Sequence, residues 1–217
     1  MFRLLSHISI VNAENNSDLT IDFVNAISIN QSWDNLTQTA KITIPRNLKY
    51  NKESIYEGEQ PLIKRGCKVT IWGGYEPNIN ILFEGYISKI DNNVPVVISC
   101  EDEMFNIKQM SAPNITLSNP TLEELLTKVA AGRFKFDALD CNLGNFRFNN
   151  ASIGLILKTL KDNYGLYSYW RDGKLHCGLA YKQPTEANEF TFLFENNMCK
   201  DGMNLQYMKK EDVKFIV

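Results

Sequence analysis

Three consecutive carboxylates are the strongest candidates for acid–base chemistry in this sequence: Glu101, Asp102 and Glu103, which follow a β-branched run. Glycosidases use a pair of carboxylates to cleave the glycosidic bond. Consecutive residues on a strand point to opposite faces, however, so adjacent carboxylates rarely converge on one bond. We therefore interpret the triplet as a charged junction between a strand and a helix, in which Asp102 caps the turn Met104–Ile107.

Two aromatic groups could bind a ligand by stacking. Trp72-Gly73-Gly74-Tyr75 has the composition of a sugar-stacking platform or of a glycine loop for phosphate. We favour a turn between strands at the two glycines, with the rings packed on a barrel. Tyr167, Tyr169 and Trp170 could stack nucleic-acid bases, but their hairpin has one acidic and two basic residues, which is a weak complement to phosphate. We expect these rings to pack against two neighbouring helices.

Histidines and catalytic motifs give no site. His7 and His176 are far apart in the sequence, each within a predicted strand, and we interpret both as ordinary strand residues. The sequence contains no H-E-x-x-H, G-x-S-x-G, G-x-x-x-x-G-K-[ST] or G-x-G-x-x-G. We accordingly assign no catalytic residue, no cofactor-binding residue and no metal ligand, and we predict a protein that is not an enzyme and needs no cofactor.

The cysteines also argue against a disulfide-bonded or metal-binding fold. Their number is odd, their spacing is wide, and no C-x-x-C occurs, so neither a disulfide framework nor a zinc knuckle is indicated. We expect unpaired, mostly buried thiols at all five positions, which are Cys67, Cys100, Cys141, Cys177 and Cys199.

Composition excludes several classes of protein. The 217 residues are 44% hydrophobic, 11% aromatic and 22% charged, which is typical of a globular chain and not of a disordered or coiled-coil one. Lysine and arginine number 23 against 25 aspartate and glutamate, a net charge of −2, so bulk nucleic-acid binding lacks its usual driving force. No apolar run reaches the length of a membrane helix or a signal sequence, which predicts a soluble chain with no membrane anchor.

Residues 1–110 are predicted to form a small β-barrel. Alternating β-branched and aromatic residues over this stretch are typical of half-buried antiparallel strands. A long loop is expected at residues 46–66, which are polar and punctuated by glycine and proline. The strands that we identify are Phe23–Ile29, Ala40–Ile44, Lys68–Trp72, Ile81–Ile90 and Val94–Cys100, the last two joined by a turn at Asp91-Asn92-Asn93.

Residues 111–182 are predicted to form a compact α+β module. A helix is expected to begin at a capping box of Thr121 and Glu124 and to end at Gly132. Its apolar face consists of Leu122, Leu125, Leu126, Val129 and Ala130. A second helix is expected from Asn150 or Ser152 to Gly165. The alternating runs on either side of Asp172-Gly173 predict a hairpin, and Phe134–Phe136 and Phe146–Phe148 are added as short strands.

Residues 183–217 return to a strand pattern in Phe190–Phe194 and Val213–Val217. Two or three strands are too few for an independent barrel. Because the chain ends inside an apolar run, we expect this stretch to be the start of a second β-barrel that is truncated here. The predicted fold class is α+β, predominantly antiparallel β.

Several segments together resemble the phage baseplate hub family, the late-control-D type proteins of contractile tails, which are similar to the hub part of type VI secretion spikes. The later helix Ser152–Gly165 and the hairpin Tyr164–Leu175 resemble the intermediate module of that family. The segments of the first part that carry the resemblance are Ser32–Thr37, Ala40–Arg46, Lys64–Tyr75, Leu82–Ile90 and Ile98–Asp102.

The resemblance implies a tail-tube-like β-barrel, an inserted α+β module and a second tube-like barrel. It implies a structural subunit that joins the tail tube to the central spike as a homotrimer, whose six barrels match the sixfold tube. Tube and spike proteins would be its partners, in the baseplate of a virion tail assembled in the bacterial cytoplasm. The channel of such a hub passes DNA or a tape-measure protein without specific binding, which a near-neutral charge suits.

Two other functions stay open at this point. One is a cell-wall hydrolase or a carbohydrate-binding tail component, which would rely on Glu101, Asp102 and the aromatic residues. The other is an adaptor of an unrelated secretion apparatus.

Overall fold

The computed structural model describes residues 4–12, 17–46, 49–50, 53–54, 62–91 and 93–180. Contacts between Cα atoms divide the chain into two compact units, Met1–Leu179 and Ala180–Val217. The strands predicted beyond residue 182, and with them the start of a second barrel, lie outside the described residues. The division at residues 110 and 182 stays a prediction.

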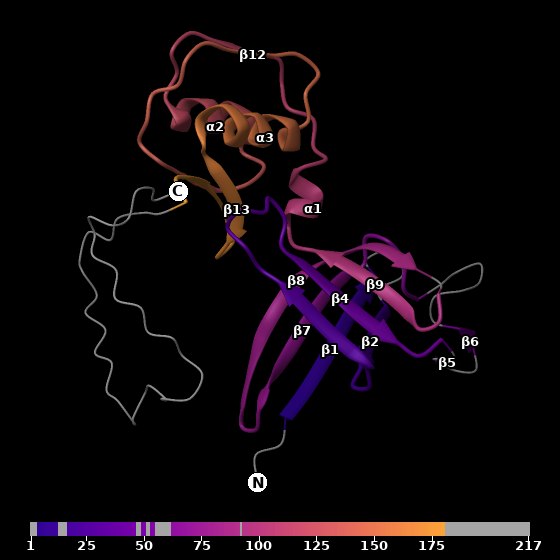
Figure 1. Ribbon diagram of the computed structural model, residues 1–217. Helices are drawn as coiled ribbons and strands as arrows, with labels where there is room; N and C mark the ends of the chain where they lie inside the picture. Colours follow the sequence, from indigo (N-terminus) through magenta and orange to yellow (C-terminus); the bar gives the residue numbers. More distant parts are fainter. Residues whose placement is uncertain are drawn as a thin grey trace, which may run out of the picture. The chain divides into compact units, whose positions relative to one another are not determined.

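A seven-stranded antiparallel sheet dominates the first half of the chain, with the strand order β2-β1-β7-β8-β9-β4-β3 (Figure 1). Alternate residues are buried in β4 and β9, as the period-two pattern predicts. Their buried side chains form one hydrophobic core with those of the neighbouring strands. The strands are β1 (Leu4–Asn12), β2 (Ser17–Ile21), β3 (Ala26–Asn30), β4 (Thr39–Ile44), β7 (Lys68–Tyr75), β8 (Asn78–Asp91) and β9 (Val96–Glu101).

The predicted barrel is an open sheet in the described part of the chain. Among these residues, β2 pairs only with β1 and β3 pairs only with β4, so the two outer strands do not pair with each other. The predicted long loop at residues 46–66 contains two short paired strands, β5 (Lys49–Tyr50) and β6 (Glu53–Ser54). The predicted fold class, α+β with mostly antiparallel β structure, is confirmed.

The predicted turn at Gly73 and Gly74 is wrong, because both glycines lie inside β7. A Cβ atom at Gly73 would stand 2.6 Å from Leu82 Cδ1, and one at Gly74 would stand 2.2 Å from the carbonyl oxygen of Asn78. The glycines therefore allow β8 to approach closely, and the register of the two strands shifts between Ile71 and Trp72.

An α+β module follows β9 and has a hydrophobic core of its own. Its two longer helices, α2 (Leu122–Ala130) and α3 (Ile153–Tyr164), both contribute buried side chains to this core (Figure 1). Strands β11, β14 and β13 form a three-stranded sheet in which β11 and β14 are parallel, a pairing that the sequence pattern did not predict. The remaining elements are α1 (Met104–Ile107), β10 (Ile115–Leu117), β11 (Phe136–Ala138), β12 (Phe146–Phe148), β13 (Tyr167–Arg171) and β14 (Lys174–Gly178).

The helix ends follow local chemistry. Thr121 and Glu124 form the predicted capping box at the start of α2, with each side chain accepting from the other residue's backbone N–H. Ser152 caps α3, and Gly165 ends that helix with a left-handed φ of 64°. The hairpin of β13 and β14 turns through Asp172 and Gly173, both with positive φ, as Asp-Gly predicts.

The end of α2 differs from the prediction by one residue and stores conformational strain. The left-handed position is Ala131, with φ 46° and ψ 37°, and Gly132 follows with φ 75°. A left-handed conformation costs an alanine roughly 1–2 kcal/mol. We expect Ala131→Gly to raise the free energy of unfolding by about 1 kcal/mol, measured by chemical denaturation.

The control for this prediction is Ala130→Gly, which places glycine in the last turn of the helix itself, where the side chain is buried. We expect this variant to lose about 1 kcal/mol. Equal effects of the same sign at both positions would contradict the assignment of strain to Ala131.

Candidate functional site

The candidate functional site is the junction between the large sheet and the α+β module. Residues 31–38, which connect β3 to β4, contact α3 and β13 of the module. Lys161 on α3 donates to Asp34 Oδ1 at 2.8 Å and to the backbone oxygen of Asp34 at 2.7 Å. Trp33 stands edge-on against Tyr167, with ring centroids 4.8 Å apart.

Lys161 is the link between these contacts. Its ammonium lies 5.2 Å from the centre of the Tyr167 ring, in the position of a cation–π contact. The hydrogen bond to Asp34 raises the pKa of Lys161, so its ammonium stays charged. We call these four residues, Trp33, Asp34, Lys161 and Tyr167, the junction clamp.

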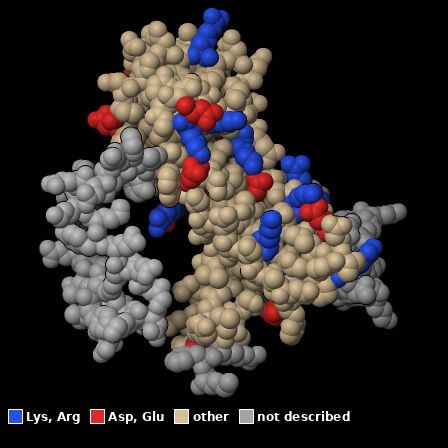
Figure 2. Space-filling model, viewed as in Figure 1, with Lys and Arg blue, Asp and Glu red and all other residues tan. Residues whose placement is uncertain are grey.

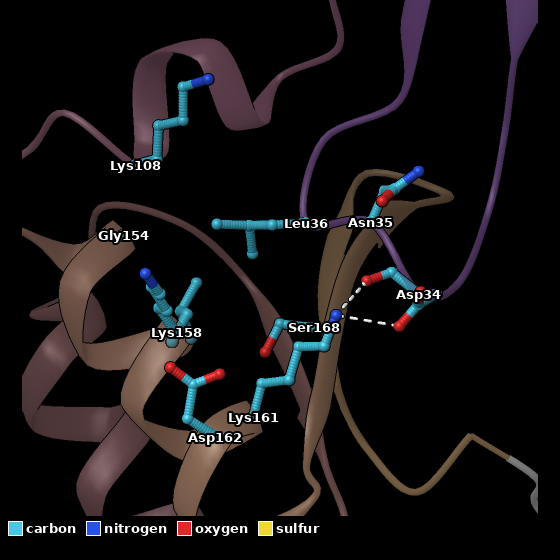
Figure 3. A pocket seen from close by; sticks show the side chains of 10 residues that line it. Asp34, Asn35, Leu36, Lys108, Gly154, Lys158, Lys161, Asp162 and Ser168 are labelled. Carbon is cyan, nitrogen blue, oxygen red and sulfur yellow. Dashed lines mark hydrogen bonds and ion pairs between the residues drawn. The ribbon is translucent and has the colours of Figure 1, made fainter. Parts of the chain in front are cut away.

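A groove of about 410 Å³ opens beside the junction clamp. Figure 3 shows Lys161 reaching from α3 toward Asp34, with Lys158 and Asp162 on the same helix. Lys108 borders the groove too, but its ammonium is paired with Glu101. The groove therefore mixes both signs of charge and has no nucleophile–base pair of the kind that covalent catalysis requires.

The three candidate carboxylates do not share a site. Glu101 pairs with Lys108, and Glu103 accepts a hydrogen bond from the Asn106 amide at 3.2 Å. Asp102 is only 4% exposed and accepts from two backbone N–H groups, those of Met104 at 3.1 Å and Gln38 at 3.2 Å. The predicted strand–helix junction is confirmed, because Asp102 binds the first amide of α1.

Asp102 also connects the end of β9 to the segment that joins β3 to β4. Its backbone N–H donates to the carbonyl of Gln38 at 3.1 Å, so Asp102 and Gln38 are held by two hydrogen bonds. Burial raises the pKa of Asp102 to about 6, although both amide donors oppose the shift. The side chain of Gln38 in turn donates to the backbone oxygen of Trp170 at 3.5 Å.

Both histidines are strand residues, as predicted. His7 lies on β1 and pairs with Asp22 at 2.7 Å, and its ring is 5.3 Å from that of Trp72. His176 lies on β14, 3.3 Å from Asp137, and its Nε2 atom is buried without a hydrogen-bond partner among the described residues. The two histidines stand on different sheets and form no common site.

The cysteines agree with the prediction where the structure describes them. Cys67, Cys100 and Cys177 are buried, Cys141 is half-buried, and none of these four forms a disulfide. Burial raises the pKa of Cys100 to about 12 and of Cys177 to about 11, so both are unreactive thiols at neutral pH. Cys199 lies outside the described residues.

The aromatic predictions are confirmed in part. Trp170 packs against the core of the module, as expected for the hairpin. Tyr167 contacts Lys161 of α3, as expected, and also Trp33, whereas Tyr169 stacks on His176 of β14. Tyr75 is 58% exposed at the end of β7, so it does not pack on the sheet as predicted.

In the described residues, no group of three or more His, Cys, Asp or Glu side chains is arranged to hold a metal ion. No helix in the described part of the chain is long and apolar enough to cross a membrane.

The junction clamp is the part of the site that sequence reasoning missed. Asp34 and Lys161 are 127 positions apart, and neither stands in a motif with chemistry of its own. Trp33 and Asp34 entered only through the resemblance to hub proteins. A local pattern carries no signal for a contact at this separation.

Comparison with known proteins gives a match of fold alone. No family model matches this chain, and no curated protein matches it. The tail protein of Neisseria meningitidis MC58 superposes with a TM-score of 0.51 at 14% identity, over 81% of this chain and 51% of that protein. The 43 kDa tail protein of prophage MuSo2 from Shewanella oneidensis gives a TM-score of 0.53 at 14% identity, over 79% and 54%.

This chain thus spans about half the length of both tail proteins. The expectation from the hub-like segments was a tail-protein fold, and two tail proteins from different bacteria match it over about four-fifths of the chain. The chain therefore has the fold of phage and prophage tail proteins.

Proposed function

We propose that this chain is a structural subunit of a phage or prophage-derived contractile tail, placed in the baseplate hub between the tail tube and the central spike. The observation that carries the proposal is the antiparallel sheet, which is open among the described residues with β2 and β3 as its outer strands, in a fold shared with tail proteins. An outer strand with unpaired backbone groups is a template for pairing with another chain.

The two outer strands, β2 and β3, are the opposite edges of one sheet. Pairing of one edge with the other edge of the next copy favours a ring of copies. Contact of β2 in one copy with β3 in the next is a heterologous interface, and such an interface forms a closed ring when the rotation between neighbouring copies closes. A homotrimer is the closed ring that the resemblance to hub proteins implies. Tube and spike proteins are the proposed partners above and below this ring, in a virion tail assembled in the bacterial cytoplasm.

The charge distribution fits a channel wall that does not hold nucleic acid. The net charge of the sequence is −2. On the face that Figure 2 draws, the basic and acidic side chains lie among one another instead of in separate fields. A protein that binds nucleic acid electrostatically needs a concentrated positive surface. DNA would pass such a hub without a specific contact.

The alternative of a cell-wall hydrolase has no support from the carboxylates on which it relied. Glu101 is paired with Lys108, and both oxygens of Asp102 are occupied by backbone amides in a buried position. Neither group is placed to protonate a leaving oxygen, which general acid catalysis requires.

The trimer can be tested by light scattering after size exclusion, at several concentrations of the 217-residue chain. We expect a mass three times that of the chain. The double variant Thr20→Lys and Ser28→Lys places charge on exposed positions of both outer strands and is expected to give monomers, since charged edges block strand addition.

The matched control is Ser118→Lys, which adds the same charge at an exposed position outside the seven-stranded sheet. This variant should remain trimeric, and all three proteins should have the same circular dichroism spectrum. A monomeric wild-type chain at every concentration would contradict the homotrimer, and a trimeric double variant would exclude the outer strands as its interface.

A further inference from the structure

The hairpin of β13 and β14 has a row of aromatic side chains on the face that points away from the core of the α+β module. Ser168 faces that core and is buried, whereas Tyr167 and Tyr169, which alternate with it, are half-buried. Tyr169 stacks on His176 across the hairpin, with ring centroids 5.3 Å apart and an angle of 14° between the rings. Trp33, which is 40% exposed, extends the row beyond Tyr167.

A cleft of about 610 Å³ opens beside this row of rings. The cleft is lined by three rings, two amides and one ion pair: Trp33, Tyr169, Trp170, Gln31, Gln38, Arg171 and Asp172. Such a lining, with flat apolar rings and a few convergent polar groups, is that of a small-molecule or oligomer site.

The two amides are already oriented by the protein. Gln31 donates one amide hydrogen to the carbonyl of Leu82 at 3.0 Å, and Gln38 donates one to the carbonyl of Trp170 at 3.5 Å. A side-chain amide has two donors and an acceptor oxygen. Each glutamine therefore keeps an oxygen and one N–H with which to bind a ligand.

The charges around the cleft favour an uncharged ligand. Two basic side chains near the rings have acidic partners: Lys161 with Asp34 at 2.8 Å and Arg171 with Asp172 at 3.7 Å. Single-stranded nucleic acid binds to stacked rings only where a positive groove also follows its backbone. Paired charges of this kind supply little net attraction for phosphate.

We propose that this cleft binds an uncharged glycan chain. The C–H faces of pyranose rings pack against Trp33 and Tyr169, and the sugar hydroxyls bond to the amides of Gln31 and Gln38. The role is separate from assembly into a tail, because none of these residues belongs to the outer strands β2 and β3. Binding would give the tail protein a contact to a polysaccharide surface.

The test is calorimetric titration of the full chain with three probes: chitohexaose, cellohexaose and an oligothymidylate. We expect saturable binding of at least one hexasaccharide, and the pair distinguishes an N-acetylated glycan from a plain glucan. Trp33→Ala and Tyr169→Ala should each weaken that binding about tenfold, because each removes one ring contact. Gln38→Ala should weaken it as well, without touching the backbone N–H that bonds to Asp102.

Two variants control for loss of fold. Tyr169→Phe keeps the ring and should bind as the wild type does, and Ile79→Ala removes an exposed side chain of β8 that does not line the cleft. Thermal melting of every variant identifies those that are folded. Binding of the oligothymidylate alone, absence of binding to all three probes, or equal weakening by Ile79→Ala and Tyr169→Ala would overturn the proposal.

Discussion

Replacing Gly85 by alanine is expected to lower the free energy of unfolding by about 3 kcal/mol. Gly85 is buried in β8, where a Cβ atom would stand 2.1 Å from the carbonyl oxygen of Glu101 and 2.9 Å from Phe83 Cε1. The first of these atoms belongs to the backbone of β9, so no side-chain rotation relieves the contact. The two strands must separate where Tyr86 faces Glu101.

Gly144→Ala is the matched control for Gly85→Ala. A Cβ atom there would meet only the hydroxyl of Tyr164, at 3.3 Å, which is the far end of a flexible side chain. We expect a change of less than about 1 kcal/mol. Urea denaturation of both variants measures the difference, and similar midpoints for the two would refute the close approach of β8 and β9 at Gly85.

Asp102 is expected to make the stability of the fold depend on pH between about 4 and 6. Its pKa is raised from 3.8 to about 6 by burial, so the folded state binds this proton more tightly than the unfolded state. The contribution of Asp102 to the free energy of unfolding therefore falls as the pH rises from 3.8 through 6, and levels off above that range. The contribution of this carboxyl is at most about 3 kcal/mol.

The measurement is chemical denaturation of the wild type and of Asp102→Asn at a series of pH values. The asparagine side chain stays neutral, so the variant lacks this contribution while other carboxyl groups titrate alike in both proteins. We expect the stability of the wild type relative to the variant to be highest at pH 4 and to decline toward pH 7. A constant difference across the series would mean that Asp102 titrates alike in the folded and unfolded chains.

Local chemistry made the ends of helices and hairpins predictable. Thr121 and Glu124 are three residues apart, and Asp172 and Gly173 are adjacent, so their hydrogen bonds and dihedral angles depend on little beyond the segment itself. Asp102 belongs to the same class, because its cap on Met104 spans two residues. These features agree with the sequence-based expectation.

Features that depend on pairing between segments far apart in the sequence could not be predicted. Gly73 and Gly74 are compatible with a turn or with a closely packed strand, and the choice depends on Leu82 and Asn78 of the partner strand. The parallel pairing of β11 with β14 likewise joins segments separated by a whole helix. The glycan cleft was not predicted, because Trp33 and Tyr169 meet there only after the sheet and the module have formed.

The junction clamp has a consequence for the order in which the chain folds. Asp34 and Lys161 close a loop of 127 positions, and such contacts form late because the entropy of loop closure must be offset first. The sheet residues leave the ribosome before α3 and β13 do, since domains fold from the N-terminus during synthesis. The side chain of Trp33 therefore lacks its contact with Tyr167 until that residue has been synthesised. A chaperone that recognises exposed aromatic side chains can bind Trp33 during that interval.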